Sequence, residues 1–82
     1  MTETADITVY GADWCSDCRR SKALLEREGV DYRWIDVDAD ETAAAKALAL
    51  TGRTSIPVVV FSDGAYLVEP SDEALRAKLA AV

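Results

Sequence analysis

The sequence contains no histidine, and this absence excludes several kinds of chemistry. Without an imidazole, the 82-residue chain cannot build a serine–histidine or cysteine–histidine catalytic pair, or bind a metal through histidine. It also has only two cysteines, too few for the several disulfides that typically stabilise a small secreted protein. We therefore expect a cytoplasmic protein in which a disulfide is transient or catalytic.

Long apolar runs and an excess of positive charge are also absent. No apolar segment is long enough for a transmembrane helix, and the polar N-terminal segment MTETAD predicts no secretory signal. The formal net charge is −6, which argues against nucleic-acid binding because affinity for phosphates comes from lysine and arginine. We therefore expect neither a membrane nor a nucleic acid as a partner.

The length and the apolar pattern predict the fold class. A chain of this length suffices for one domain, residues 1–82. Alternating and β-branched segments predict strands, and capped segments of helical period predict helices. The strands are expected at 6–10, 32–37, 57–61 and 65–69, and the helices at 16–28, from about 40 to 51 and from about 71 to 82. We expect a β-α-β-α-β-β-α order and an α/β two-layer sandwich with a mixed four-stranded sheet.

The sequence also predicts no resident metal. A structural zinc site needs four ligands, so the two cysteines would require a second chain or carboxylates. The acidic run that starts at Asp36 resembles a calcium loop, but Glu41 stands where that loop needs glycine and Ala47 where it needs an acid. We interpret the run as a strand end and a helix cap at Asp38 or Asp40. An iron–sulfur cluster shared between two chains stays open as an alternative.

The segment DWCSDC places Cys15 and Cys18 between the first predicted strand and the first predicted helix. A cysteine at a helix N-terminus lies where unpaired backbone N–H groups favour an anion, here a nucleophilic thiolate. Cys15 is therefore the expected attacking thiol, and Cys18, shielded within the first turn, the resolving thiol. Two merely buried cysteines are the alternative. Asp17 opposes a nearby thiolate, while the cations Arg19, Arg20 and Lys22 favour one, so the net effect stays open.

A second candidate segment is RTSIPVVVF. Pro57 opens a buried strand, where its missing N–H does least harm, and the Ile56–Pro57 bond is a candidate for the cis form. A cis bond would present the backbone of Ile56 as a docking edge for an extended thiol substrate. Arg53 is a candidate to bind a substrate carboxylate. The alternative is that it is an ordinary solvated arginine on the surface.

These segments together resemble the thioredoxin superfamily, and within it the glutaredoxin branch. VYGADWCSDC, SIPVVVFSDGAYLVEPS and EALRAKL are most similar to the mycoredoxins, which reduce mixed disulfides between proteins and mycothiol. The resemblance implies a nucleophilic Cys15, a resolving Cys18 and a thiol-binding surface. The residues that it implies for this surface are Trp14, Ile56, Pro57, Ser71 and Asp72, with Arg53 as a further candidate.

The resemblance also implies a function. We expect a monomeric thiol–disulfide oxidoreductase without a tightly bound cofactor, acting on S-thiolated or disulfide-bonded proteins. Mycothiol is favoured over glutathione as the small thiol, because Ala12 stands where glutathione-using glutaredoxins have lysine, and VEPSD replaces their Gly-Gly and Asp-Asp pairs. One alternative is a dithiol electron donor reduced by a flavoprotein such as thioredoxin reductase. Another is a non-catalytic module that senses redox state or binds a cluster.

Overall fold

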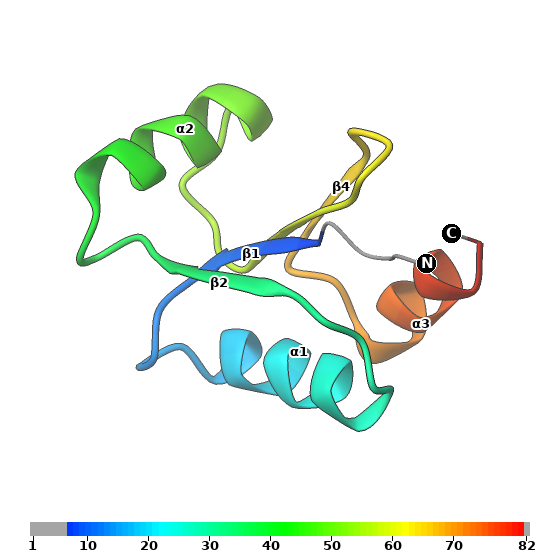
Figure 1. Ribbon diagram of the computed structural model, residues 1–82. Coiled ribbons are helices and arrows are strands. Elements are labelled where there is room, and N and C mark those ends of the chain that lie inside the picture. Colours follow the sequence, from blue (N-terminus) through cyan, green and yellow to red (C-terminus); the bar gives the residue numbers. More distant parts are fainter. Residues whose placement is uncertain (1–6, 82) are drawn as a thin grey trace.

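The computed structural model describes residues 7–81 and has the predicted order of strands and helices (Figure 1). The strands are β1 (Thr8–Gly11), β2 (Arg33–Asp36), β3 (Val58–Val60) and β4 (Tyr66–Val68), and the helices are α1 (Ser16–Arg27), α2 (Glu41–Thr51) and α3 (Asp72–Ala81). The polar N-terminal segment, with the first residue of the predicted strand, and the predicted helix end at Val82 lie outside this range. The β-α-β-α-β-β-α order is confirmed, with small shifts at the ends of the elements.

The four strands form one mixed sheet in the order β2-β1-β3-β4. β1 pairs with β2 in parallel, as the connecting helix α1 requires, and pairs with β3 antiparallel on its other side. β3 and β4 form the predicted antiparallel hairpin, in which Phe61 N donates to Ala65 O at 2.8 Å. β1 therefore lies inside the sheet, and its C-terminal end leads directly into the cysteine motif.

Helices cover both faces of this sheet, which corrects the expected two-layer arrangement to three layers. α1 and α3 lie on one face and α2 lies on the other (Figure 1). The reason is that β1 and β3 carry apolar side chains on both faces, so each face has to be covered. Val9 and Tyr10 illustrate this, because neighbours in a strand point to opposite faces and these two belong to different core clusters.

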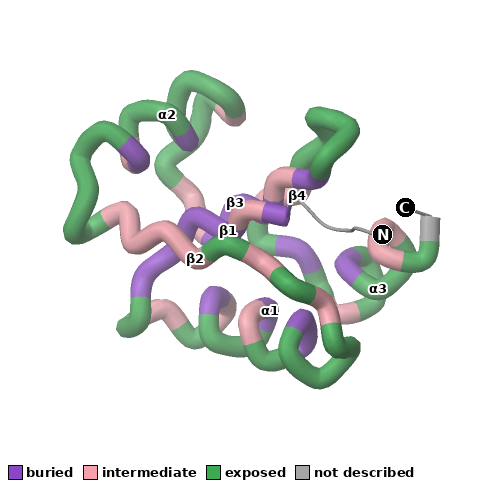
Figure 2. Tube along the Cα trace, in the orientation of Figure 1, coloured by how far each residue is buried: buried purple, intermediate pink, exposed green. Residues whose placement is uncertain are grey.

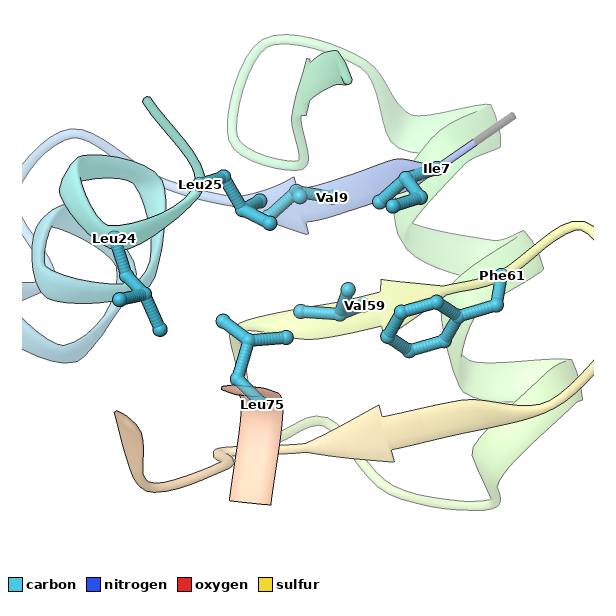
Figure 3. Close-up of a cluster of buried hydrophobic side chains, with 7 residues drawn as sticks. All are labelled: Ile7, Val9, Leu24, Leu25, Val59, Phe61 and Leu75. Atoms are coloured by element: carbon cyan, nitrogen blue, oxygen red, sulfur yellow. The ribbon is translucent and has the colours of Figure 1, made fainter. Parts of the chain in front are cut away.

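The larger core cluster lies between the sheet and the pair α1 and α3. Its buried members are Ile7, Val9, Leu24, Leu25, Val59, Phe61 and Leu75 (Figure 3). The predicted inner face of α1 is confirmed, since Cys18 and Ser21 are buried together with its two leucines. The cysteine motif is thus carried by a helix that is fixed to the sheet along its whole length.

The smaller cluster joins α2 to the opposite face. It consists of Tyr10, Ala43, Ala47 and Val58. Because α2 contributes only alanines, most of its surface stays exposed (Figure 2). The burial of apolar area therefore fixes α2 less strongly than α1.

The helix ends follow the expected capping pattern. Asp40, and not Asp38, caps α2 by accepting a hydrogen bond from Ala43 N at 3.1 Å. Gly52 ends α2 with a φ of 73°, a conformation that favours glycine. Ser71 caps α3 by accepting from Ala74 N at 3.0 Å. In residues 7–81, no helix combines the length and the apolar character needed to cross a membrane.

Candidate active site

Cys15 is the N-cap residue of α1, as the sequence predicts. The turn that follows β1 is closed by a hydrogen bond from Cys15 N to Ala12 O of 3.2 Å. The Sγ atom of Cys15 accepts a hydrogen bond from the backbone N–H of Cys18 at 3.3 Å, and the residue is partly exposed. The sulfur of Cys15 therefore lies at the positive end of the helix, next to backbone N–H groups.

Cys18 is fully buried in the first turn of α1. Burial, and after it the hydrogen bond with Cys15, raises the pKa of the Cys18 thiol from 9.0 to about 12. The backbone of Ala12 opposes this rise, and the charges of Cys15 and Asp17 add smaller raising effects. Cys18 is therefore a neutral thiol at neutral pH. The two cysteines thus differ in exposure, since Cys15 is partly exposed and Cys18 is buried.

The structure adds two residues that the sequence analysis missed, Gly11 and Trp34. A Cβ atom on Gly11 would lie 2.9 Å from Cys18 Sγ and 2.8 Å from Trp34 Cη2. The ammonium of Lys22 lies 4.2 Å from the centroid of the Trp34 ring. A glycine that ends a strand beside the cysteine motif signals such a close approach. The sequence could not show that a tryptophan on the next strand fills the space.

Trp14 precedes the cysteine motif and is 69% exposed. Its indole Nε1–H donates to Oδ2 of Asp38, in the segment between β2 and α2. This contact replaces the predicted alternative of Asp38 as a helix cap. The ring next to Cys15 is thereby held at one end while much of its surface faces solvent.

The Ile56–Pro57 peptide bond is cis, as predicted. Pro57 is buried, and its carbonyl accepts from Glu69 N at 2.8 Å. Ile56 is partly buried, and no backbone group of residues 7–81 forms a hydrogen bond with its N–H or C=O. Its backbone therefore retains free hydrogen-bonding groups that an extended chain can use.

Arg53 is exposed and lines a mostly apolar cavity of about 200 Å³ between α2 and the segment that precedes Pro57. Ile56 lines the same cavity. The hydroxyl of Thr51 fixes the backbone of Arg53, with two hydrogen bonds of 3.1 Å. The structure thus places Arg53 and Ile56, two of the predicted thiol-binding residues, on one cavity.

Ser71 and Asp72 lie at the N-terminus of α3, and Asp72 is joined to the cysteine motif by an ion-pair chain. Arg20 Nε lies 3.5 Å from Asp72 Oδ1, and Arg20 Nη1 lies 3.2 Å from Asp17 Oδ1. The hydroxyl of Ser71 is already engaged as the helix cap. Arg20 therefore offsets two carboxylates, including the one within the C-x-x-C motif.

Because Arg20 pairs with Asp17, its removal should affect the reactivity of Cys15. In a Cys18→Ser background, we expect Arg20→Gln to slow alkylation of Cys15 by iodoacetamide by about twofold to threefold at low salt, because it leaves the Asp17 charge unopposed. High salt should remove the difference. Arg76→Gln, which breaks a surface pair with Glu28, is the matched control and should have no effect. Equal rates at low salt would show that Asp17 is too strongly screened to matter.

The raised pKa of Cys18 predicts a loss of stability at alkaline pH. The folded state holds the thiol proton more tightly than the unfolded state, so this stabilisation is complete below pH 9.0 and is lost as the pH rises through about 12. The slope from one group is at most about 1.4 kcal/mol per pH unit. Urea unfolding of the reduced protein between pH 8 and 11 measures it. Cys18→Ala should flatten this slope, whereas parallel curves for the two proteins would contradict the prediction.

In residues 7–81, no three acidic or cysteine side chains are grouped so that they could hold a metal ion. Comparisons with known proteins agree with the fold. The family model described as Glutaredoxin matches residues 7–66. Mycoredoxin 1 of Corynebacterium glutamicum is 34% identical over 79 residues, which cover 95% of this chain and 98% of that protein.

Two solved structures are also similar. The glutaredoxin from Archaeoglobus fulgidus superimposes with a TM-score of 0.82 at 30% identity, over 93% of this chain and 87% of that one. The glutaredoxin-like NrdH-redoxin from Escherichia coli gives a TM-score of 0.76 at 29% identity, over 89% and 93% of the two chains. Its structure is described as the basis of a thioredoxin-like activity profile.

Proposed function

The chain belongs to the glutaredoxin family and is a thiol–disulfide oxidoreductase of that type, and we propose a more specific activity for it. In this proposal the protein reduces mixed disulfides between other proteins and a small thiol. Cys15 and Cys18 carry the reaction. The observation that supports this most strongly is the contrast between the two sulfurs, one partly exposed at a helix N-terminus and the other fully buried and protonated. A pair of this kind separates attack from resolution.

The first step transfers the small thiol from the protein to Cys15. The Cys15 thiolate attacks the sulfur of the small thiol in the mixed disulfide, and a new disulfide forms between these two sulfur atoms. The bond to the client protein breaks, and the client sulfur leaves as a thiolate that takes a proton from solvent. The client is thereby reduced.

The second step frees Cys15 by one of two routes. A second molecule of the small thiol attacks the bound one, which releases a small-thiol disulfide and the Cys15 thiolate. Alternatively, Cys18 attacks the Cys15 sulfur, releases the small thiol and leaves a Cys15–Cys18 disulfide. After the second route, two molecules of the small thiol or a flavoprotein disulfide reductase supply the two electrons and two protons that reduce the Cys15–Cys18 disulfide to two thiols.

Recognition of the small thiol uses the surface around Cys15. We assign the free backbone N–H and C=O of Ile56, next to the buried Pro57, to docking, and the exposed ring of Trp14 to packing against the bound thiol. Arg53, beside the 200 Å³ cavity, is assigned to a polar or anionic group of the ligand.

We also assign Ser71 and Asp72, at the N-terminus of α3, to binding of the small thiol. Mycothiol is favoured over glutathione because Ala12 is buried and supplies no cation. The similarity to mycoredoxin 1 supports the same choice.

The remaining expectations from the sequence become part of the same proposal. We assign residues 1–82 to one domain that acts as a monomer in the cytoplasm, without a tightly bound cofactor. S-thiolated or disulfide-bonded proteins are its clients.

A second candidate function is that of a dithiol electron donor reduced directly by a flavoprotein. The similarity to NrdH-redoxin from Escherichia coli favours it, since that protein has a thioredoxin-like activity profile. In this case Cys15 and Cys18 react with a protein disulfide, and no small thiol takes part. A redox-sensing or cluster-binding module is the remaining alternative.

The choice of reductant tests these functions. The oxidised protein is mixed with NADPH and, separately, with the mycothiol, glutathione or thioredoxin reductase system, and NADPH oxidation is followed. We expect the mycothiol system to reduce it fastest. Rapid reduction by thioredoxin reductase alone would favour the electron donor. Failure of all three systems, with stoichiometric iron in the purified protein, would favour the cluster-binding module.

A further inference from the structure

The side chain of Trp34 and the buried sulfur of Cys18 both border the space above Gly11, where β1 has no side chain of its own. A Cβ atom on Gly11 would lie 2.9 Å from Cys18 Sγ, 2.8 Å from Trp34 Cη2 and 3.1 Å from Trp34 Cζ3. The sulfur and the outer edge of the indole ring are therefore neighbours across the space above Gly11. Sulfur atoms and aromatic ring edges attract each other in this arrangement.

The contact joins three elements of the fold. Gly11 ends β1, Cys18 lies in the first turn of α1, and Trp34 comes from β2. Trp34 is the partner of Val9 in the parallel register, so its ring has to lean along the sheet to reach Gly11. A ring that leans in this way comes close to the sulfur, and the exposed fraction of Cys18 is 0%.

A second contact holds the ring in place. The ammonium of Lys22, one helical turn beyond Cys18, lies 4.2 Å from the centroid of the Trp34 ring. A cation over an aromatic face is attracted to it. Since Lys22 and Cys18 belong to the same helix, this contact ties the ring to the element that carries the sulfur.

We propose that Trp34 is a positioning residue that shields the Cys18 sulfur from external thiols and disulfides and keeps it directed at Cys15. The inference rests on the proposed function, which gives Cys18 the resolving step. In that step the Cys18 and Cys15 sulfurs bond, the bond between Cys15 and the small thiol breaks, and the small thiol leaves with the Cys18 proton. The cysteine pair is oxidised and the small thiol reduced. Because external thiols and disulfides do not reach the Cys18 sulfur, Cys15 is the group with which it reacts.

Alkylation of Cys18 tests the shield. In a Cys15→Ser background, Cys18 is the only thiol, and its reaction with iodoacetamide is followed by mass spectrometry. We expect Trp34→Leu to raise the rate by about tenfold, because it removes the ring edge but keeps an apolar side chain on the strand. Tyr66→Leu, an aromatic replacement on the opposite edge strand, should change the rate by less than about twofold.

A general loosening of the fold has to be separated from loss of a local shield. Leu79→Ala removes a partly buried side chain that packs on the same core, and it is compared with Trp34→Leu after both melting temperatures are measured. We expect a faster reaction only for Trp34→Leu. Equal acceleration by both variants, or a Trp34→Leu rate within about twofold of the parent, would overturn the proposal.

A spectroscopic measurement keeps the proposal testable if Trp34→Leu does not fold. The chain has two tryptophans, so in Trp14→Phe the emission comes from Trp34 alone. Oxidation of the cysteine pair should change this emission, because the ring edge and the Cys18 sulfur border the same space above Gly11, and unchanged emission would overturn the proposal. Neither readout requires turnover with a small thiol, so the shield and the proposed function can fail independently.

Discussion

Replacement of Cys15 by serine should lower the rate of mixed-disulfide reduction by at least about a thousandfold, to the uncatalysed level. Cys15 is the partly exposed sulfur at the N-terminus of α1 and accepts a hydrogen bond from Cys18 N, whereas Cys18 is fully buried. No other thiol in the chain is therefore able to begin the reaction. The measurement is turnover of an S-thiolated protein with excess small thiol and the matching reductase.

Cys18→Ser is the matched variant, because it removes one sulfur from the same helix turn. With a small thiol as reductant, this variant should keep at least about a third of the activity, since the second small thiol can free Cys15 without Cys18. A dithiol electron donor would lose activity completely in both variants. Substantial activity in Cys15→Ser would contradict the assignment of the nucleophile.

Replacement of Gly11 by alanine should lower the free energy of unfolding by about 1–3 kcal/mol. The added Cβ would lie 2.8 Å from the ring of Trp34 and 2.9 Å from the sulfur of Cys18, and both neighbours are parts of packed elements. One of them has to move, so the alkylation rate of Cys18 should rise as well. Urea unfolding and mass spectrometry of the alkylated protein measure these two effects.

Gly52→Ala is the control for Gly11→Ala. Gly52 has a φ of 73° and open space around its Cβ position, so alanine there costs about 1 kcal/mol through the backbone alone. It should leave the alkylation of Cys18 unchanged. Trp34→Leu should recover part of the loss in Gly11→Ala, with a coupling of at least about 0.5 kcal/mol. Strictly additive effects would show that the two residues do not share the space.

Local signals in the sequence were sufficient to predict the strands, helices and caps. Alternating apolar residues predicted β1, and Gly52 predicted the end of α2. The layering was not predictable in the same way, because α2 presents only Ala43 and Ala47 to the sheet. An alanine-rich helix has a weak apolar face, so its pattern does not show which side of the sheet it covers.

In the candidate site, too, some features were predictable from the sequence and others were not. The N-cap position of Cys15 followed from a motif a few residues long, and the cis bond before Pro57 followed from the place of its segment in the predicted topology. The closeness of Trp34 and Cys18 at Gly11 depends on how β1 and β2 pair and on where the ring leans, so no local pattern contains it. The same holds for the ion pair between Arg20 and Asp72, which joins two helices.

The central claim is that Cys15 takes the small thiol from a protein mixed disulfide. The most direct test incubates the reduced Cys18→Ser variant with a mycothiolated protein and determines the intact masses and the modified peptide. We predict one mycothiol on Cys15 for each client thiol released. An unmodified Cys15, or a disulfide between Cys15 and the client protein in place of the mycothiol adduct, would contradict the account.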